Sequence, residues 1–164
     1  TSGLLIVGKN SNAQDKIIHQ MHKDYVEKTY ITLVNGIVSD DEFTVNLPIG
    51  RPDPDSPLRS VMEVHGKPSI THVKVLERFS SGFTLLKVRL ETGRTHQIRV
   101  HLTHLGHPLC GDTLYGDHCP EIIDRQALHA YNLSFKHPTN DKKMEFEAPL
   151  PEDFLKAIEI IKNM

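Results

Sequence analysis

The segment from residue 83 to residue 106 restricts the fold most, because it contains a strand, a turn and a helix in immediate succession. Alternate residues of 83–90 would share one face of a β-strand. Thr92-Gly93 ends that alternation and predicts a turn. From about Arg94 onward, apolar residues recur at spacings of three and four, which predicts an amphipathic helix that ends at Gly106. The predicted buried stripe of this helix consists of Ile98, His101, Leu102 and Leu105.

Arg94 lies where this helix is predicted to start, and a cation there opposes the helix macrodipole. The position becomes favourable if an anion lies nearby, because free backbone N–H groups and a guanidinium can bind a carboxylate or phosphate together. An ordinary ion pair with an acidic neighbour would satisfy Arg94 equally well. The residues alone leave both interpretations open.

The composition is that of an ordinary globular protein, with 38% hydrophobic and 24% charged residues, so the 164-residue chain can form one core. A formal net charge of −2 argues against a broadly basic nucleic-acid-binding surface but leaves room for a local basic groove. No apolar run reaches membrane-spanning length, and no signal-peptide pattern is present. Two cysteines are too few for a disulfide framework, so a location in the reducing cytoplasm is expected.

The remaining segments predict further strands and two more helices in one α+β domain, with no internal repeat or linker. The apolar run at 4–7 is typical of a buried strand, and 12–23 has the periodicity of an amphipathic helix. Asn35-Gly36 predicts a turn inside the strand-like stretch 26–38, after which Ile37-Val38 would continue the pairing. Additional strands are predicted at 43–47, 71–78, 127–135 and 143–147, and a last helix after Pro151 would bury Phe154, Ile158 and Ile161.

Two loops are predicted, one at 48–59, which contains four prolines and is expected to be exposed, and one at 117–125. Arg51, Arg59 and Lys67 flank the proline-rich loop. These cations either bind phosphates or are simply solvated, and their positions in the sequence do not decide between the two.

A cluster of histidines and cysteines after residue 100 raises the question of a metal site. No Cys-x-x-Cys pair occurs, and histidines spaced by three residues continue past Gly106, which is unlike the paired spacing of structural zinc sites. Histidines that donate to backbone carbonyls, cap the helix or contact RNA explain the pattern better. We therefore expect no metal at the residues concerned, which are His101, His104, His107, Cys110, His118 and Cys119.

Beyond this local chemistry, the motif TGRTHQIRVH at 92–101, followed by GHPLCGDTLYG at 106–116, closely resembles the signature of the RluA family of pseudouridine synthases. Other similar pieces occur in the family's order along the chain. They are TSGLLIVGK at 1–9, EKTYITLVNG at 27–36, PIGR at 48–51, KPSITHVKVLER at 67–78, LHAYNLSFKHP at 129–138 and FEAPLPEDF at 146–154. The resemblance therefore covers nearly the whole chain.

The resemblance implies an enzyme that isomerises specific uridines in structured ribosomal or transfer RNA to pseudouridine, without a cofactor or metal. It implies an α+β fold in which a mixed, mostly antiparallel sheet is flanked by helices and crossed by an RNA-binding cleft. RNA is the expected partner, no membrane is expected, and a monomer is favoured.

Matching positions in the family also imply roles for individual residues. Tyr30 would lie beside the target base and assist removal of the proton on C5, although by itself it would count as an ordinary core or edge tyrosine. Arg94 would pair with the catalytic aspartate and order the flipped nucleotide, which supplies the anion that its position suggested. The residues expected to support the pocket or to contact RNA are Thr95, His96, Gln97, Arg99 and His101.

The sequence departs from the family pattern at the nucleophile. The family places its catalytic aspartate in a His-Arg-Leu-Asp motif, three residues before a threonine that corresponds to Thr1. Residues 1–164 are therefore expected to be a catalytic domain that is truncated at its amino-terminal end and inactive as it stands. The alternatives are a non-catalytic RNA-binding domain, a zinc-dependent nucleic-acid protein, and a structural domain that binds neither RNA nor metal.

Overall fold

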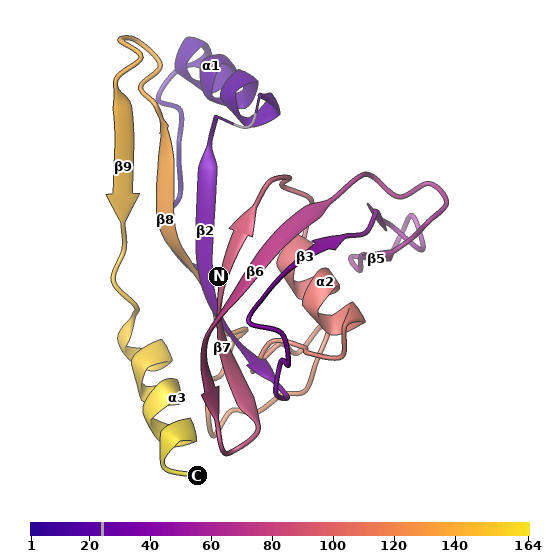
Figure 1. Cartoon of the computed structure of the whole chain (residues 1–164). Coiled ribbons are helices and arrows are strands. Elements are labelled where there is room, and N and C mark those ends of the chain that lie inside the picture. Colours follow the sequence, from indigo (N-terminus) through magenta and orange to yellow (C-terminus); the bar gives the residue numbers. More distant parts are fainter. Residues whose placement is uncertain (24) are drawn as a thin grey trace.

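The computed structural model describes residues 1–23 and 25–164, which fold around one seven-stranded sheet (Figure 1). Its strands are β1 (Ser2–Gly3), β2 (Glu27–Asn35), β3 (Glu42–Asn46), β6 (Ile70–Phe79), β7 (Phe83–Leu90), β8 (Leu128–Lys136) and β9 (Lys143–Glu147), and the helices are α1 (Ser11–His22), α2 (Gln97–His104) and α3 (Glu152–Lys162). The strand order is β1-β8-β2-β7-β6-β3, with β9 also paired to β8. Only β1 and β8 are parallel among the described strands. The expected mixed, mostly antiparallel sheet with flanking helices is therefore confirmed.

The central strands β2 and β7 are apolar on both faces, so that both faces of the sheet are covered by a helix. Val34 and Leu86 point into the cluster that includes residues of α2. Leu33 and Leu85 point into the cluster that includes residues of α3. Because neighbouring residues of a strand face opposite ways, α2 and α3 lie on opposite sides of the sheet (Figure 1). Each fully buried leucine or valine stabilises the fold by about 1.5–3 kcal/mol, so the packing on both faces stabilises the centre of the sheet.

Helix α2 begins at Gln97, three residues later than its predicted start at Arg94. The backbone N–H of Arg94 donates to Gln97 Oε1 at 3.0 Å, so a side chain closes the turn that the sequence pattern assigned to helix. The predicted end is confirmed, since Gly106 has a φ of 82° and donates to the Thr103 carbonyl at 2.9 Å. Leu105, which we expected to be buried, is 41% exposed because it follows the last helical turn.

Residues 4–7 do not form the buried strand that their apolar run predicted. Leu5 and Val7 are instead 84% and 73% exposed. The edge of β8 that faces away from β2 is taken by β1 at His129 and by β9 from Asn132 onward. A strand needs an edge with unpaired N–H and C=O groups, and β8 offers no such stretch to residues 4–7.

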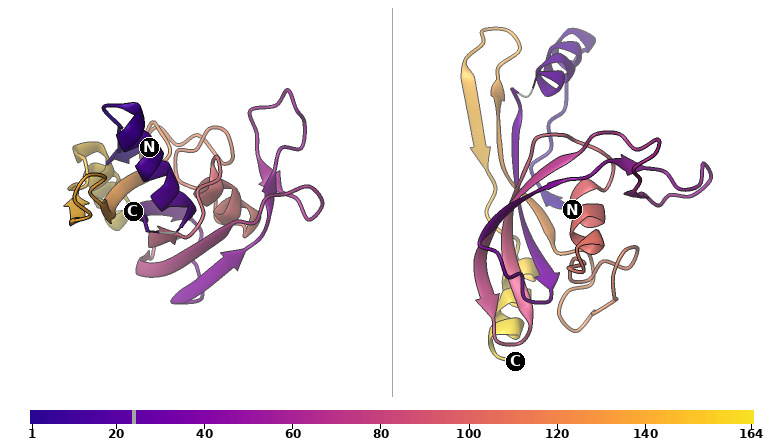
Figure 2. Two further views of the ribbon diagram at one scale, coloured as in Figure 1. Left: turned by 90° about the horizontal axis from the view of Figure 1, so that it is seen from above. Right: turned by 45° about the vertical axis from the view of Figure 1, so that its right-hand side comes forward.

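The turn at Asn35-Gly36 is confirmed, but Ile37-Val38 does not continue the strand beyond it. Gly36, with a φ of 86°, donates to the Gly82 carbonyl at 2.8 Å, so the chain turns beside the first residues of β7. Residues 48–67 contain the small hairpin of β4 (Ile49–Gly50) and β5 (Ser60–Val61). Figure 2 shows this segment projecting from the sheet.

The first and last helices form where they were predicted. Helix α1 is capped by Asn10, whose side chain accepts from the Ala13 N–H at 2.9 Å, and it buries Ile17 but leaves Ile18 partly exposed. Helix α3 buries Phe154 and Ile161 as expected, together with Ala157, whereas Ile158 is only partly buried. None of the helices in the described part of the chain is both long and apolar enough to cross a membrane.

Candidate active site

A cavity of about 260 Å³ lies between the start of α2, the end of β7 and the first residue of the chain. Tyr30 and Arg94, the two residues expected to be catalytic, both line it together with Thr1. Figure 2 shows the amino terminus beside α2. The complete lining consists of Thr1, Tyr30, Leu90, Arg94, His96, Gln97, Ile98, Arg99, Gln126 and Leu128.

Tyr30 reaches the cavity from β2, where it pairs with Val88 of β7 and packs against the apolar cluster beneath α2. Burial raises the pKa of Tyr30 above its usual value of 10.0. The hydroxyl is therefore a neutral phenol at physiological pH, able to donate a hydrogen bond or to stack on a base but poorly suited to accept a proton itself.

Gln97 and His101 hold the start of α2 against the sheet, and both are buried. Gln97 donates to the Ile70 carbonyl at 2.9 Å, while its own carbonyl accepts from the Arg94 N–H. The two ring nitrogens of His101 meet the Thr71 hydroxyl at 2.8 Å and the Leu47 carbonyl at 2.9 Å. The roles expected for these residues were support of the pocket and contact with RNA. Because His101 is completely buried, it can support the pocket but cannot contact RNA.

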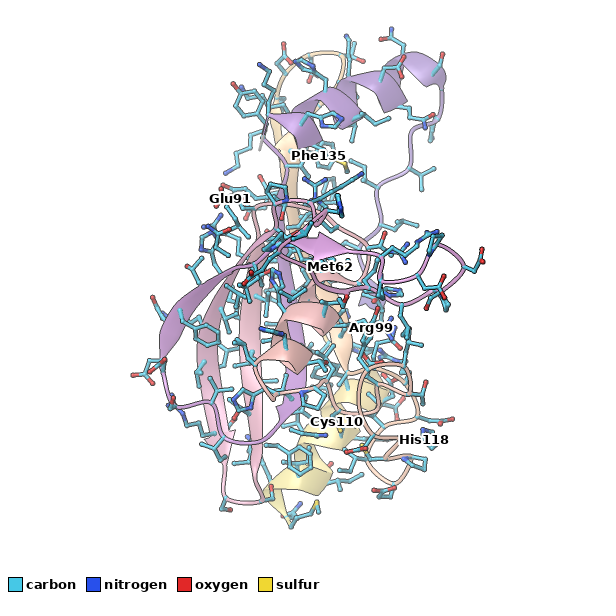
Figure 3. The ribbon with its side chains drawn as sticks, turned by 90° about the vertical axis from the view of Figure 1, so that its right-hand side faces the viewer. Met62, Glu91, Arg99, Cys110, His118 and Phe135 are labelled. Atoms are coloured by element: carbon cyan, nitrogen blue, oxygen red, sulfur yellow. The ribbon has the colours of Figure 1, made fainter. Side chains whose placement is uncertain are left out.

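Arg99 forms the strongest polar contact of the site, a two-pronged ion pair with the buried Asp112. Its Nε and Nη2 each lie 2.7 Å from one carboxylate oxygen, and Figure 3 shows Arg99 on α2. Burial alone would raise the pKa of Asp112, but the hydrogen bonds from Arg99 and from the backbone N–H groups of Leu114 and Tyr115 outweigh it and lower the pKa. The pair is thus charged and rigid, which fixes Arg99 at the wall of the cavity.

Asp112 is a site residue that the sequence analysis missed. It sits in a tight turn that begins at Gly111, whose φ is 70° and whose missing Cβ would lie 2.4 Å from the Arg125 carbonyl. An aspartate is by itself a signal for a turn, because its carboxylate can accept backbone N–H groups further along the chain, as it does here from Leu114 and Tyr115. That signal identifies a turn, but it does not name Arg99 as the partner.

The exposed Arg94 lines both the cavity and a second, larger groove of about 550 Å³, and Thr95 lines the groove beside it. Arg94 Nε donates to the Pro68 carbonyl at 3.2 Å, and within the described residues Arg94 takes part in no ion pair. The groove is lined by cations without a carboxylate among the lining residues, which are Ile49, Gly50, Arg51, Arg59, His65, Lys67, Gly93, Arg94 and Thr95. All three cations that flank the proline-rich loop therefore face one surface.

His96 and Tyr115 link this groove to the cavity through a short hydrogen-bonded chain. The Tyr115 hydroxyl accepts from the Arg59 backbone N–H at 2.8 Å and lies 2.9 Å from His96 Nδ1. The hydroxyl has one proton and two lone pairs, so it can either donate to His96 Nδ1 or accept from it. Burial, followed by the charges of Arg99 and Arg59, lowers the pKa of His96 and favours its neutral state.

We expect the free energy of unfolding to decrease as the pH falls from about 7 to 5. Burial lowers the pKa of His101 in the folded state, although the hydrogen bond to Leu47 partly offsets it. The unfolded chain then binds more protons than the folded one below the usual pKa of 6.5, so stability is lost as the pH falls through that value. Urea denaturation across this range measures the slope. His101→Asn should flatten it, and an unchanged slope in that variant would contradict this assignment.

Among the described residues, no group of three or more histidine, cysteine, aspartate or glutamate side chains is arranged to hold a metal ion. His101 and His107 instead contact backbone carbonyls, those of Leu47 and Asn35. The buried sulfur of Cys110 contacts Cys119.

Comparison with known proteins relates this geometry to a family. Residues 1–104, more than half of the chain, match the family of RNA pseudouridylate synthases. A Bacillus subtilis protein named uncharacterized RNA pseudouridine synthase YlyB is 46% identical over 99% of this chain and 53% of its own length. The ribosomal large subunit pseudouridine synthase D of Neisseria meningitidis serogroup A is 41% identical over 99% of this chain and 46% of its own length. The chain thus spans about half the length of these curated relatives.

Solved structures agree with the sequence comparison. Human RNA pseudouridylate synthase domain containing 1 superimposes with a TM-score of 0.73 and 30% identity, covering 87% of this chain and 62% of the human one. Human RNA pseudouridylate synthase domain containing 4 shares the fold, with a TM-score of 0.76 at 17% identity over 93% of this chain and 69% of the human one. The chain therefore belongs to the RNA pseudouridylate synthase family, and within it to the RluA type that its motifs indicated.

Proposed function

We propose that residues 1–164 form the catalytic domain of an RNA pseudouridine synthase that isomerises selected uridines in ribosomal or transfer RNA, without a cofactor or metal. Membership in the family supports the class of reaction. Relatives named ribosomal large subunit pseudouridine synthase D support a ribosomal substrate. A ribosomal or transfer RNA substrate would support a cytoplasmic location, and we propose that the protein acts as a monomer.

One observation carries the proposal, namely that the Tyr30 cavity and the basic groove meet at Arg94. The glycosidic bond of a uridine that is stacked in a helix is out of an enzyme's reach. The enzyme must therefore first flip the nucleotide out of the stack, at a cost of a few kcal/mol. The groove offers cations to the phosphates on either side of a flipped nucleotide, while the cavity offers an aromatic ring and a smaller space to its base.

The nucleophile of this proposal is an aspartate carried by a segment that precedes Thr1. Thr1 lines the cavity together with Arg94 and Arg99, and such a segment would enter there. The two guanidinium groups would keep a carboxylate ionised at this point, since a cation within a few ångströms favours the charged form. We propose that Arg94, whose charge no carboxylate of the described residues neutralises, pairs with that aspartate. Arg99, held by Asp112, would add to the positive field.

The aspartate would act on the sugar, by attack at C1′ or by removal of a sugar proton, and the freed uracil would turn and rejoin the sugar through C5. A proton must then leave C5. The raised pKa of Tyr30 argues against a phenolate base, so we propose that Tyr30 stacks on the turning base or passes the proton through a water molecule.

The proposal is tested with an extended version of the protein, in which a His-Arg-Leu-Asp motif precedes Thr1 at the family's spacing. Ribosomal RNA labelled with tritium at uridine C5 should release its tritium to water, because pseudouridine formation removes that hydrogen. A matched version with asparagine in place of the added aspartate controls for release without the nucleophile. Equal release from the two versions would contradict the proposed function, and RNA binding without any release would favour the alternative of a non-catalytic RNA-binding domain.

We expect the groove to supply the salt-dependent part of RNA binding. Each cation that contacts a phosphate releases a counterion, so Arg51→Ala and Lys67→Ala should each weaken binding and reduce the slope of log affinity against log salt by about 1. Filter binding at several salt concentrations measures both quantities. Lys143→Ala, on the exposed edge strand β9, is the matched control and should leave the slope unchanged. If the groove variants behave like this control, the phosphates bind elsewhere.

A further inference from the structure

Two thiols lie in contact behind the candidate site. The sulfur atoms of Cys110 and Cys119 are 3.7 Å apart, and both thiols are free. Cys110 is completely buried, whereas Cys119 is partly exposed on the loop at 117–125. Figure 3 shows Cys110 below α2 and His118, the neighbour of Cys119, on the outer loop.

Backbone hydrogen bonds hold both cysteines in this arrangement. Cys110 donates to the Leu33 carbonyl at 2.9 Å and accepts from the Ala127 N–H at 2.8 Å, which ties it to the sheet. The Cys119 carbonyl accepts from the Ile122 N–H at 3.0 Å, and its sulfur accepts from the Gly111 N–H at 3.3 Å. These hydrogen bonds fix the backbone on both sides of the contact between the two thiols.

We propose that Cys110 and Cys119 form a reversible disulfide site whose oxidant is a low-molecular-weight disulfide such as glutathione disulfide. A disulfide requires the sulfur atoms to approach to about 2.05 Å, and the side chains must rotate from their present contact to reach that separation. This site is independent of the proposed RNA chemistry, because neither thiol lines the Tyr30 cavity.

The environments of the two thiols set the order of events. Burial, together with the adjacent Cys119, raises the pKa of Cys110, so its thiolate is disfavoured. Cys119 therefore attacks first, as a thiolate, on one sulfur of glutathione disulfide; the S–S bond breaks and one glutathione leaves. Cys110 then gives up its proton and attacks the sulfur of Cys119, displacing the second glutathione. The protein dithiol is oxidised by two electrons, the glutathione disulfide is reduced, and the two thiol protons end on the two glutathione molecules.

The bond would close the loop of residues 110–119, which contains Asp112, the partner of Arg99. Cross-linking a loop of this length restricts the unfolded chain and should raise Tm by roughly 5–10 °C in a domain of this size. The oxidised form would thus hold the turn behind Arg99 more firmly than the reduced form does. Oxidation would act on the stability of the site and leave the residues of its cavity in place.

The experiment incubates the 164-residue protein with glutathione disulfide and follows it by intact mass, thiol titration and thermal unfolding. We expect the protein to lose the mass of two hydrogens and both titratable thiols, to remain monomeric on a non-reducing gel, and to gain the Tm increase, all reversed by dithiothreitol. Cys110→Ser should stop at a mixed disulfide that carries one glutathione on Cys119. Cys119→Ser should remain unmodified, because the buried Cys110 has no partner that reacts first.

The two serine variants keep the test decisive if one of them folds poorly, since each makes a different prediction of mass. A mixed disulfide that accumulates in the unaltered protein, or a disulfide between two molecules, would overturn the proposal. Modification of Cys119→Ser at the rate of the unaltered protein would do the same.

Discussion

In the extended protein, Arg94→Ala is expected to lower the rate of tritium release by about 100- to 1,000-fold, while RNA binding weakens only several-fold. Arg94 is exposed and takes part in no ion pair of the described residues, so its removal should leave the fold intact. The loss should therefore come from the site, where the guanidinium would no longer keep the nucleophilic carboxylate ionised and oriented. Single-turnover release with RNA in excess of its dissociation constant separates the chemical step from binding.

Two companion variants make this test specific. Arg89→Ala removes a cation from β7 that lines a different surface, and it should leave turnover unchanged. Arg94→Lys keeps the charge but loses the planar, two-pronged geometry, so we expect partial activity. Full turnover in Arg94→Ala would refute the role of Arg94 and transfer it to Arg99, which lines the same cavity as Thr1.

Asp112→Ala is expected to reduce the free energy of unfolding by about 3–5 kcal/mol. The substitution leaves the guanidinium of Arg99, whose side chain is only 12% exposed, without the carboxylate that neutralises it. It also removes the acceptor of the Leu114 and Tyr115 N–H groups, so the turn itself loses its closing hydrogen bonds. Urea denaturation at neutral pH measures the loss.

The exposed pair of Arg78 and Asp41 provides the matched control, because its carboxylate is 85% exposed. Asp41→Ala should cost less than about 1 kcal/mol, as water replaces the lost partner. If Asp112→Ala and Asp41→Ala destabilise the protein to the same small extent, the ion pair at the site is not the rigid element that its burial indicates.

Local periodicity was sufficient to predict most of the elements that form the core. The alternation in β2 and β7 and the stripe in α3 depend on which residues face the interior, and that information is present in the sequence itself. The same holds for Tyr30 and Arg94, whose motifs singled them out and which line one cavity in the structure. Family membership followed from the same motifs and is confirmed.

What the sequence could not predict depends on competition between distant segments. Residues 4–7 read as a strand by composition, but β1 and β9 occupy the edge of β8 that they would need. The helix pattern placed Arg94 on the first turn of α2, but the Gln97 side chain takes its N–H and moves the start by three residues.

The sequence by itself thus determined most of the elements, most of their buried faces and the family, because each of these rests on short-range patterns of side chains. Only the tertiary structure decided which arginine is committed to a partner, since Arg99 meets Asp112 through a turn that the 123–125 backbone shapes around Gly111. It also decided that Arg51, Arg59 and Lys67 share one groove with Arg94. Ion pairs and grooves join residues that are far apart in the chain, so their geometry exists only once the sheet has brought those residues together.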